Sequence, residues 1–101
     1  MQKLIINPSV NTLLASPRST SPQRDETPIR ILVVDDEIQL CEVLKRGLQK
    51  LSKNYTIHTA HSGDAAWELI QREQFDVMIT DLRLPGIDGL ELLKRVLSLQ
   101  L

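Results

Sequence analysis

The hydrophobic pattern from residue 29 onward indicates three strands. Residues 29–34 form a nearly continuous aliphatic run, which is typical of a strand buried on both faces of a parallel sheet. Residues 55–60 predict a second strand, whose more polar pattern places it nearer an edge. Residues 75–80 contain Val77-Met78-Ile79 and predict a third buried strand.

Helical spacing separates these strands. In the first interval, apolar residues recur three and four positions apart and predict one face of an amphipathic helix: Ile38, Cys41, Leu44, Leu48 and Leu51. In the second interval, Ser62 is a suitable N-cap for a helix that runs to about Gln71. That helix is expected to turn Ala66, Leu69 and Ile70 inward.

A third helix is expected from Asp88 onward. Asp88 is a good N-cap, and Glu91 follows three positions later, as in a capping box. The apolar face of this helix is expected to consist of Leu90, Leu92, Leu93, Val96 and Leu97. The resulting order, β-α-β-α-β-α, indicates parallel strands joined by right-handed crossovers, and therefore an α/β fold. The sequence contains no Gly-rich phosphate loop of the Walker or dinucleotide type.

The first 28 residues have a different composition. Fifteen of them are Ser, Thr, Pro, Asn or Gln, and four of the five prolines lie there, whereas all three aromatic residues follow later. A segment with so few groups to bury cannot offset the entropy that is lost on ordering. We therefore predict a disordered Ser/Pro-rich tail over residues 1–28, with an organelle-targeting segment as the weaker alternative. Residues 29–101 are expected to form one small domain.

Charge and composition exclude several classes of function. Twelve Lys+Arg and thirteen Asp+Glu give a formal net charge of -1, which argues against a nucleic-acid-binding surface. No apolar run approaches the roughly 18 residues of a membrane span. The single cysteine, Cys41, cannot form an internal disulfide, and no Cys/His spacing suggests zinc. We expect a soluble, cytoplasmic protein that binds neither nucleic acid nor membrane.

Acidic residues follow two of the predicted strands. Asp35 and Asp36 end the first strand, and Asp81 ends the third. The carboxyl ends of parallel strands share one edge of the sheet, where function collects. Like charges about 4 Å apart repel by roughly 4 kcal/mol at an effective dielectric near 20, so such a cluster must hold a proton or bind a cation. Carboxylate oxygens with access to water suit Mg²⁺ or Mn²⁺, and a carboxylate beside such an ion can attack phosphorus.

A structural role is the alternative for each acid taken singly, because acids at strand ends often cap the following helix. Asp35 or Asp36 could cap the first helix in this way. An acidic pair at one strand end together with an acid at another is far more specific for a site. Cys41 is expected to be a small core residue rather than a reactive thiol. His58 and His61 are expected to be solvated or structural rather than ligands or phosphoacceptors.

Two motifs resemble the receiver domain of bacterial-type response regulators. The first reads Ile31-Leu32-Val33-Val34-Asp35-Asp36-Glu37, and the second reads Asp81-Leu82-Arg83-Leu84-Pro85-Gly86-Ile87-Asp88-Gly89. The second matches the family pattern of Asp, two residues, an apolar residue, Pro, any residue, an apolar residue, Asp and Gly. The resemblance runs from Ile29 to about Leu97. It implies a flavodoxin-like three-layer sandwich with a parallel sheet.

The resemblance implies a role for each matching residue. Asp81 would be the phosphoryl acceptor and a metal ligand, and Asp36 would bind Mg²⁺, or Mn²⁺, directly. Asp35 would bind the ion directly or through water, and the backbone carbonyl of Arg83 would be a further ligand. The donor would be a phosphohistidine on a sensor histidine kinase or a phosphotransfer protein. The chain would then be a phosphoprotein of a two-component phosphorelay rather than an enzyme.

The sequence also departs from the family, whose sheet order is 2-1-3-4-5. Because the sequence ends at Leu101, we expect an incomplete receiver, β-α-β-α-β-α only. It would lack the Ser or Thr that ends strand four and the Lys that ends strand five, and self-catalysed transfer would be impaired. The alternative function is a receiver remnant or interaction protein without a working phosphoryl switch. A haloacid-dehalogenase-like phosphohydrolase is less favoured, because it expects Asp-x-Asp on the first strand.

The family strand order would also leave the third strand of this chain beside a missing neighbour. Val77, Met78 and Ile79 would then form an unprotected edge, which is a template for pairing with another chain. We therefore expect the chain alone to be partly unfolded or to self-associate through this exposed sheet edge.

Overall fold

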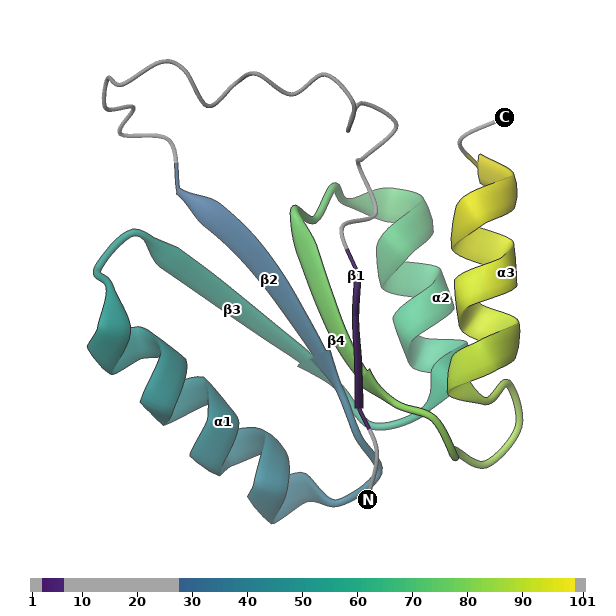
Figure 1. Cartoon of the computed structure of the whole chain (residues 1–101), viewed down its shortest axis with the longest axis horizontal. Coiled ribbons are helices and arrows are strands. Elements are labelled where there is room, and N and C mark those ends of the chain that lie inside the picture. Colours follow the sequence, from purple (N-terminus) through teal and green to yellow (C-terminus); the bar gives the residue numbers. More distant parts are fainter. Residues whose placement is uncertain (1–2, 7–27, 100–101) are drawn as a thin grey trace.

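The computed structural model describes residues 3–6 and 28–99 (Figure 1). Its elements are β1 (Lys3–Ile6), β2 (Ile29–Val34), α1 (Ile38–Leu51), β3 (Tyr55–Ala60), α2 (Gly63–Arg72), β4 (Val77–Asp81) and α3 (Gly89–Leu99). From β2 onward the order is the predicted β-α-β-α-β-α. None of the helices in these residues is long and apolar enough to span a bilayer.

Three parallel strands, β4, β2 and β3, lie side by side in the sheet, whose order is β1-β4-β2-β3. β2 pairs with β3 from Ile29 opposite Tyr55, and with β4 from Ile31 opposite Val77. β2 and β3 have the predicted bounds, whereas β4 begins at Val77 rather than at Phe75. Phe75 is buried in the connection before the strand. These strands and their intervening helices form the predicted part of a flavodoxin-like receiver fold.

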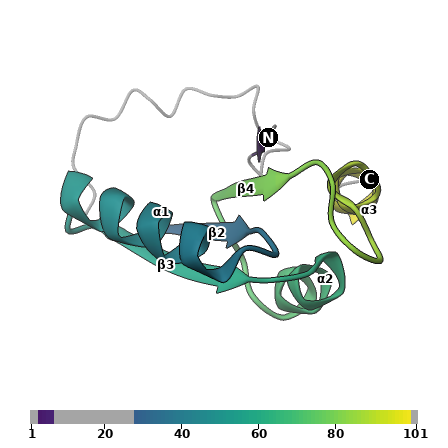
Figure 2. The same cartoon turned by 90° about the horizontal axis from the view of Figure 1, so that it is seen from below.

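The helices lie in two layers, one on each face of the sheet, and together they bury both faces of β2. Ile31 and Val33 belong to a core cluster with Cys41 and Ile57, beneath α1. On the opposite face lies a larger cluster, which α2 and α3 complete: Leu32, Val34, Ala60, Ala66, Phe75, Met78, Leu84, Leu92 and Val96. Figure 2 shows α1 and α2 on opposite sides of the sheet. Burial on both faces therefore explains the continuous aliphatic run of β2, as the sequence predicted.

The buried stripes of two helices are narrower than their apolar spacing predicts. Ile38 and Leu51, at the two ends of α1, are 59% and 74% exposed. Leu90 and Leu97 of α3 are exposed as well. Each of these residues lies on the flank of its apolar face, where a turn of about 100° per residue carries it away from the sheet. These four residues belong to the predicted apolar faces but lie outside the buried part of each face.

The structure also differs from the predicted tail. Lys3–Ile6 forms β1, which pairs antiparallel with β4, with Lys3 opposite Asp81. The prediction that β4 presents an unprotected edge is therefore wrong. A strand edge offers free N–H and C=O groups to any short extended segment within reach, and the start of this chain supplies one. Residues 7–27 of the predicted tail lie outside the described residues.

Candidate functional site

Two strands deliver the acidic residues to one end of the sheet. Asp35 and Asp36 follow β2 directly, and Asp81 is the last residue of β4. One carboxylate oxygen of each lies within 4.8 Å of those of the other two. The structure therefore brings three of the predicted site residues together. The fourth predicted site residue is Arg83, whose backbone amide donates a hydrogen bond to Asp81 Oδ1 (3.5 Å). A role for the Arg83 carbonyl as a metal ligand stays a prediction.

Asp35 is the most enclosed member of the cluster. Its side chain is 0% exposed, its Oδ1 accepts a hydrogen bond from the Glu37 amide (2.9 Å), and its Oδ2 accepts one from Lys3 Nζ. Burial by itself raises the pKa of the Asp35 carboxyl. The Lys3 ammonium and the Glu37 amide more than offset burial and hold that pKa below its ordinary value. Asp35 is therefore a stable anion in the floor of the site.

Neither acid after β2 caps the following helix. The N-cap of α1 is Glu37, and no side chain accepts a capping hydrogen bond there. By contrast, the predicted caps of the other helices are present. Ser62 Oγ accepts from the Ala65 amide (3.0 Å), and Asp88 Oδ1 accepts from the Glu91 amide (2.9 Å). The alternative in which Asp35 or Asp36 serves as a helix cap is therefore wrong, and the carboxylate of Asp36 is exposed.

Close backbone packing fixes the loop that follows Asp81. A Cβ atom added to Gly89 would lie 2.2 Å from the Asp81 carbonyl oxygen, so only glycine allows α3 to begin against the end of β4. The Gly89 amide donates to the Leu82 carbonyl (3.0 Å). Within the loop, Gly86 has a φ of 73°, in the left-handed region that glycine adopts without strain. The glycines of the second motif therefore allow the tight loop and the close packing of α3 beside Asp81.

Cys41 and His61 lie behind the cluster, against the backbone of Asp35. The Cys41 thiol donates to the Asp35 carbonyl (3.4 Å), and His61 Nδ1 is 3.2 Å from the same oxygen. Burial, and then the Asp35 charge, raises the pKa of the Cys41 thiol. Cys41 is therefore a neutral core residue, as predicted. The ring of His58 packs edge-on against Phe75, which agrees with the structural role that the sequence predicted.

Lys3 is a residue at the acidic cluster that sequence analysis missed. Its Nζ pairs with Asp35 and lies 3.8 Å from Asp81 Oδ2. The available signal was the Lys-Leu-Ile-Ile run at residues 3–6, which has a strand-like composition but is only four residues long. Nothing in that run identifies β4 as its partner, because pairing at a sheet edge depends on the rest of the fold.

The residues present fit a divalent metal ion. Asp35, Asp36 and Asp81 offer only oxygen atoms, and the exposed position of Asp36 leaves room for water ligands. Hard oxygen donors with access to water are the set that Mg²⁺ and Mn²⁺ take in proteins. These three residues would hold the ion, and the Lys3 ammonium is a further cation that pairs with Asp35 and lies 3.8 Å from Asp81 Oδ2.

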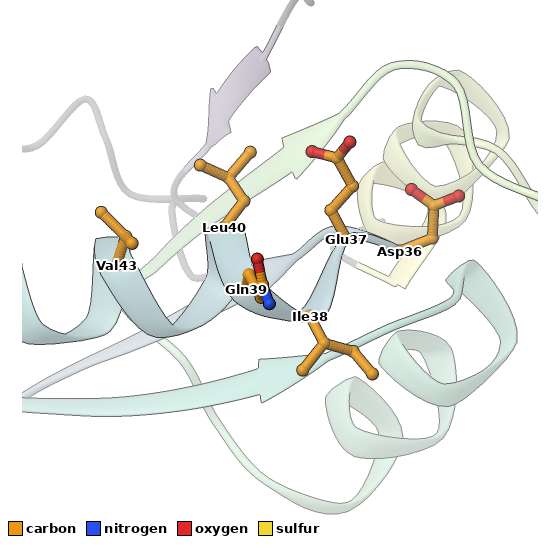
Figure 3. A pocket seen from close by; sticks show the side chains of 6 residues that line it. All are labelled: Asp36, Glu37, Ile38, Gln39, Leu40 and Val43. Carbon is orange, nitrogen blue, oxygen red and sulfur yellow. The ribbon is translucent and has the colours of Figure 1, made fainter.

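A surface hollow lies beside the acidic cluster. It has a volume of about 540 Å³ and is lined by Asp36, Glu37, Ile38, Gln39, Leu40 and Val43. Figure 3 shows these side chains along the first turns of α1, with Asp36 and Glu37 at the end nearest the site. Ile38 and Val43 are exposed in it. The surface that borders the site is therefore partly apolar and partly acidic.

Comparison with known proteins identifies the family. The response regulator receiver domain matches residues 31–100. Virulence sensor protein BvgS of Bordetella pertussis is 37% identical over 82 residues, which are 81% of this chain and 6% of that protein. Transcriptional regulatory protein TrcR of Mycobacterium tuberculosis is 39% identical over 72 residues, 71% of this chain and 27% of TrcR. Response regulator GtcR of Aneurinibacillus migulanus is 38% identical over 66 residues, 65% of this chain and 26% of GtcR.

The chain spans no more than 27% of the length of these relatives, so the likeness concerns one module of each. The matched region contains both motifs, the acidic cluster and all of the three parallel strands except the first two residues of β2. The family match covers most of the chain, and the fold and the acidic cluster agree with it. This chain therefore belongs to the response regulator receiver domain family.

Proposed function

We propose that this chain is the phosphoacceptor module of a two-component phosphorelay, and that Asp81 accepts the phosphoryl group with the help of Mg²⁺. The observation that carries the proposal is the convergence of Asp35, Asp36 and Asp81 to within 4.8 Å at the ends of two parallel strands. Membership of the receiver family supports the same function.

Asp81 is better placed than Asp35 to act as a nucleophile. Both oxygens of Asp35 accept hydrogen bonds, and its side chain is buried. The contacts of Asp81 are longer, at 3.5 Å to the Arg83 amide and 3.8 Å to Lys3 Nζ. An oxygen without a short hydrogen bond keeps a lone pair for attack on phosphorus. Asp35 and Asp36 would instead hold the ion.

The transfer step exchanges one bond to phosphorus for another. An Oδ atom of Asp81 attacks the phosphorus of a phosphohistidine in line, and the phosphorus–nitrogen bond breaks. The product is an acyl phosphate on Asp81, and the released imidazole takes up a proton. A bound Mg²⁺ supplies compensation for the negative charge on the transferring group.

The donor in this proposal is a sensor histidine kinase or a phosphotransfer protein. One relative is named a virulence sensor protein, and others are named response regulators, which supports a place in such a pathway. A protein donor that reaches Asp81 would also cover the adjoining hollow on α1, where Ile38 and Val43 offer apolar contacts. The cytoplasmic location stays a prediction.

A second function is favoured by the position of Lys3. Because its ammonium contacts both Asp35 and Asp81, the cluster has partial charge compensation within the chain itself. A receiver remnant or interaction protein that keeps the pocket without using it as a switch would have this arrangement. The two functions differ in whether Asp81 is modified.

The experiment is incubation of the full chain with acetyl phosphate and Mg²⁺, followed by intact mass spectrometry. We expect a mass increase of one phosphoryl group that base removes, as for an acyl phosphate. Asp81→Asn should abolish it. Asp64→Asn makes the same chemical change at an exposed position on α2 and should leave it intact. Modification that survives Asp81→Asn would contradict the assignment of the acceptor, and an unmodified wild-type chain would favour the remnant.

A further inference from the structure

β1 carries a cation to the acidic end of the sheet. Lys3 lies opposite Asp81 in the antiparallel ladder, and Figure 1 shows β1 alongside β4. Lys3 Nζ contacts Asp35 Oδ2 and lies 3.8 Å from Asp81 Oδ2. The ammonium therefore bridges two carboxylates that come from different strands. Its side chain is 22% exposed, so most of it is enclosed by the site.

The Asp35 and Asp81 carboxylates, which Lys3 contacts, would also serve a divalent ion. Asp35 Oδ1 accepts from the Glu37 amide, and Asp35 Oδ2 accepts from Lys3. An ion bound to Asp35 would meet the ammonium at close range, and two cations at such a distance repel strongly in a partly buried site. Joint occupancy by Lys3 and a divalent ion is therefore unfavourable.

The ion pairs of Lys3 add to the backbone ladder that holds β1 at the edge of the sheet. β1 has four residues, and among the described strands it pairs with β4 alone. The Ile5 side chain is 71% exposed and contributes little burial. Loss of the ion pairs should therefore weaken the attachment of β1 to β4.

We propose that Lys3 is an internal counter-cation of the site, that a divalent metal ion competes with it for Asp35, and that metal binding releases β1 from β4. The proposal rests on the metal site of the proposed function. β1 and the metal ion are then alternative ligands of one cluster. The start of the chain reports whether the site holds its ion, and it lowers the affinity for that ion.

The first test is calorimetric titration of the full chain with Mg²⁺. We expect Lys3→Gln to bind Mg²⁺ about tenfold more tightly than the wild type, because it removes the competing charge. Lys3→Arg keeps the charge and should bind much as the wild type does. The matched control is Lys50→Gln, which removes a positive charge from an exposed position at the far end of α1 and should leave the affinity unchanged.

The second test is amide hydrogen exchange of residues 3–6, measured by mass spectrometry. In the wild type, saturating Mg²⁺ should speed the exchange of these amides, because β1 leaves the ladder. NaCl at equal ionic strength is the control, since salt alone weakens exposed ion pairs. Circular dichroism of each variant checks that the α/β unit is intact.

The outcomes separate this proposal from the proposed function. Equal Mg²⁺ affinity in the wild type and Lys3→Gln, with exchange unchanged by Mg²⁺, overturns the competition and leaves the metal site standing. Weaker binding by Lys3→Gln also overturns it, because Lys3 would then help to hold the ion. Binding by none of the four chains overturns the metal site itself, and the competition with it.

Discussion

The two outer strands of the sheet, β3 and β1, are held in place by different interactions. β3 has six residues, runs parallel to β2 and buries Ile57 and Ala60 between the helical layers. β1 has four residues, runs antiparallel to β4 and leaves Ile5 exposed. Both strands have a backbone ladder, to which buried side chains add in β3 and the ion pairs of Lys3 add in β1.

The two kinds of interaction should respond differently to the conditions of the solution. Hydrophobic burial changes little with ions or moderate pH, so β3 should behave as part of the permanent core. Ion pairs at a sheet edge depend on pH and on competing cations. β1 should therefore be the part of this chain that its surroundings control.

The largest effect is expected from a truncation on β3. Ile57 is 7% exposed and packs in the cluster beneath α1. Replacement by Ala should lower the free energy of unfolding by about 2 to 4 kcal/mol, because it removes buried methyl groups and leaves a cavity. Urea denaturation followed by circular dichroism measures the change. A loss below about 1 kcal/mol would mean that the β3 edge is no better packed than β1.

An intermediate effect is expected from pH in the metal-free chain. The pKa of Asp35 is lowered in the folded state, chiefly by Lys3 acting against burial. A lowered folded-state pKa adds stability above the unfolded value of about 3.9, and that stability is lost as the pH falls from there through the folded-state pKa. In Lys3→Gln this acid-dependent loss should shrink by an amount on the order of 1 kcal/mol.

The measurement is urea denaturation with a chelator present, at a series of pH values from neutral to about 3. Lys50→Gln is again the control, since it changes the net charge equally at a distance from Asp35. Identical pH profiles for the wild type and Lys3→Gln would show that Lys3 does not stabilise the Asp35 anion.

The smallest effect is expected from a truncation on β1. Ile5→Ser removes an exposed side chain and should change the free energy of unfolding by less than about 0.5 kcal/mol. The same urea assay compares it directly with Ile57→Ala. A loss as large as that of Ile57→Ala would place β1 in the core and remove the contrast between the two edges.

Sequence analysis predicted the parts of this molecule that local pattern determines. The bounds of β2 and β3 and the caps at Ser62 and Asp88 follow from short-range rules that tertiary packing did not override. The meeting of the strand-end acids also followed, because parallel strands bring their carboxyl ends to one edge.

The features that were missed depend on contacts between distant segments. Periodicity identifies the apolar face of α1 but not how much of that face the sheet covers, so Ile38 and Leu51 are exposed. β1 pairs with a strand more than seventy residues away, and composition alone predicted a tail there. Lys3 was missed for the same reason, because its role arises only when β1 is docked.

One further consequence concerns the single tryptophan of the chain. Trp67 lies on α2, packs against the core cluster on that face of the sheet, and has the Arg95 guanidinium 5.5 Å from its ring centre. Its emission therefore reports the layer formed by α2 and α3, whereas circular dichroism averages over α1 as well. Because β2 contributes side chains to the cores of both layers, fluorescence and ellipticity should follow one unfolding transition. A change in fluorescence without a change in ellipticity would then indicate a rearrangement on the α2–α3 side alone.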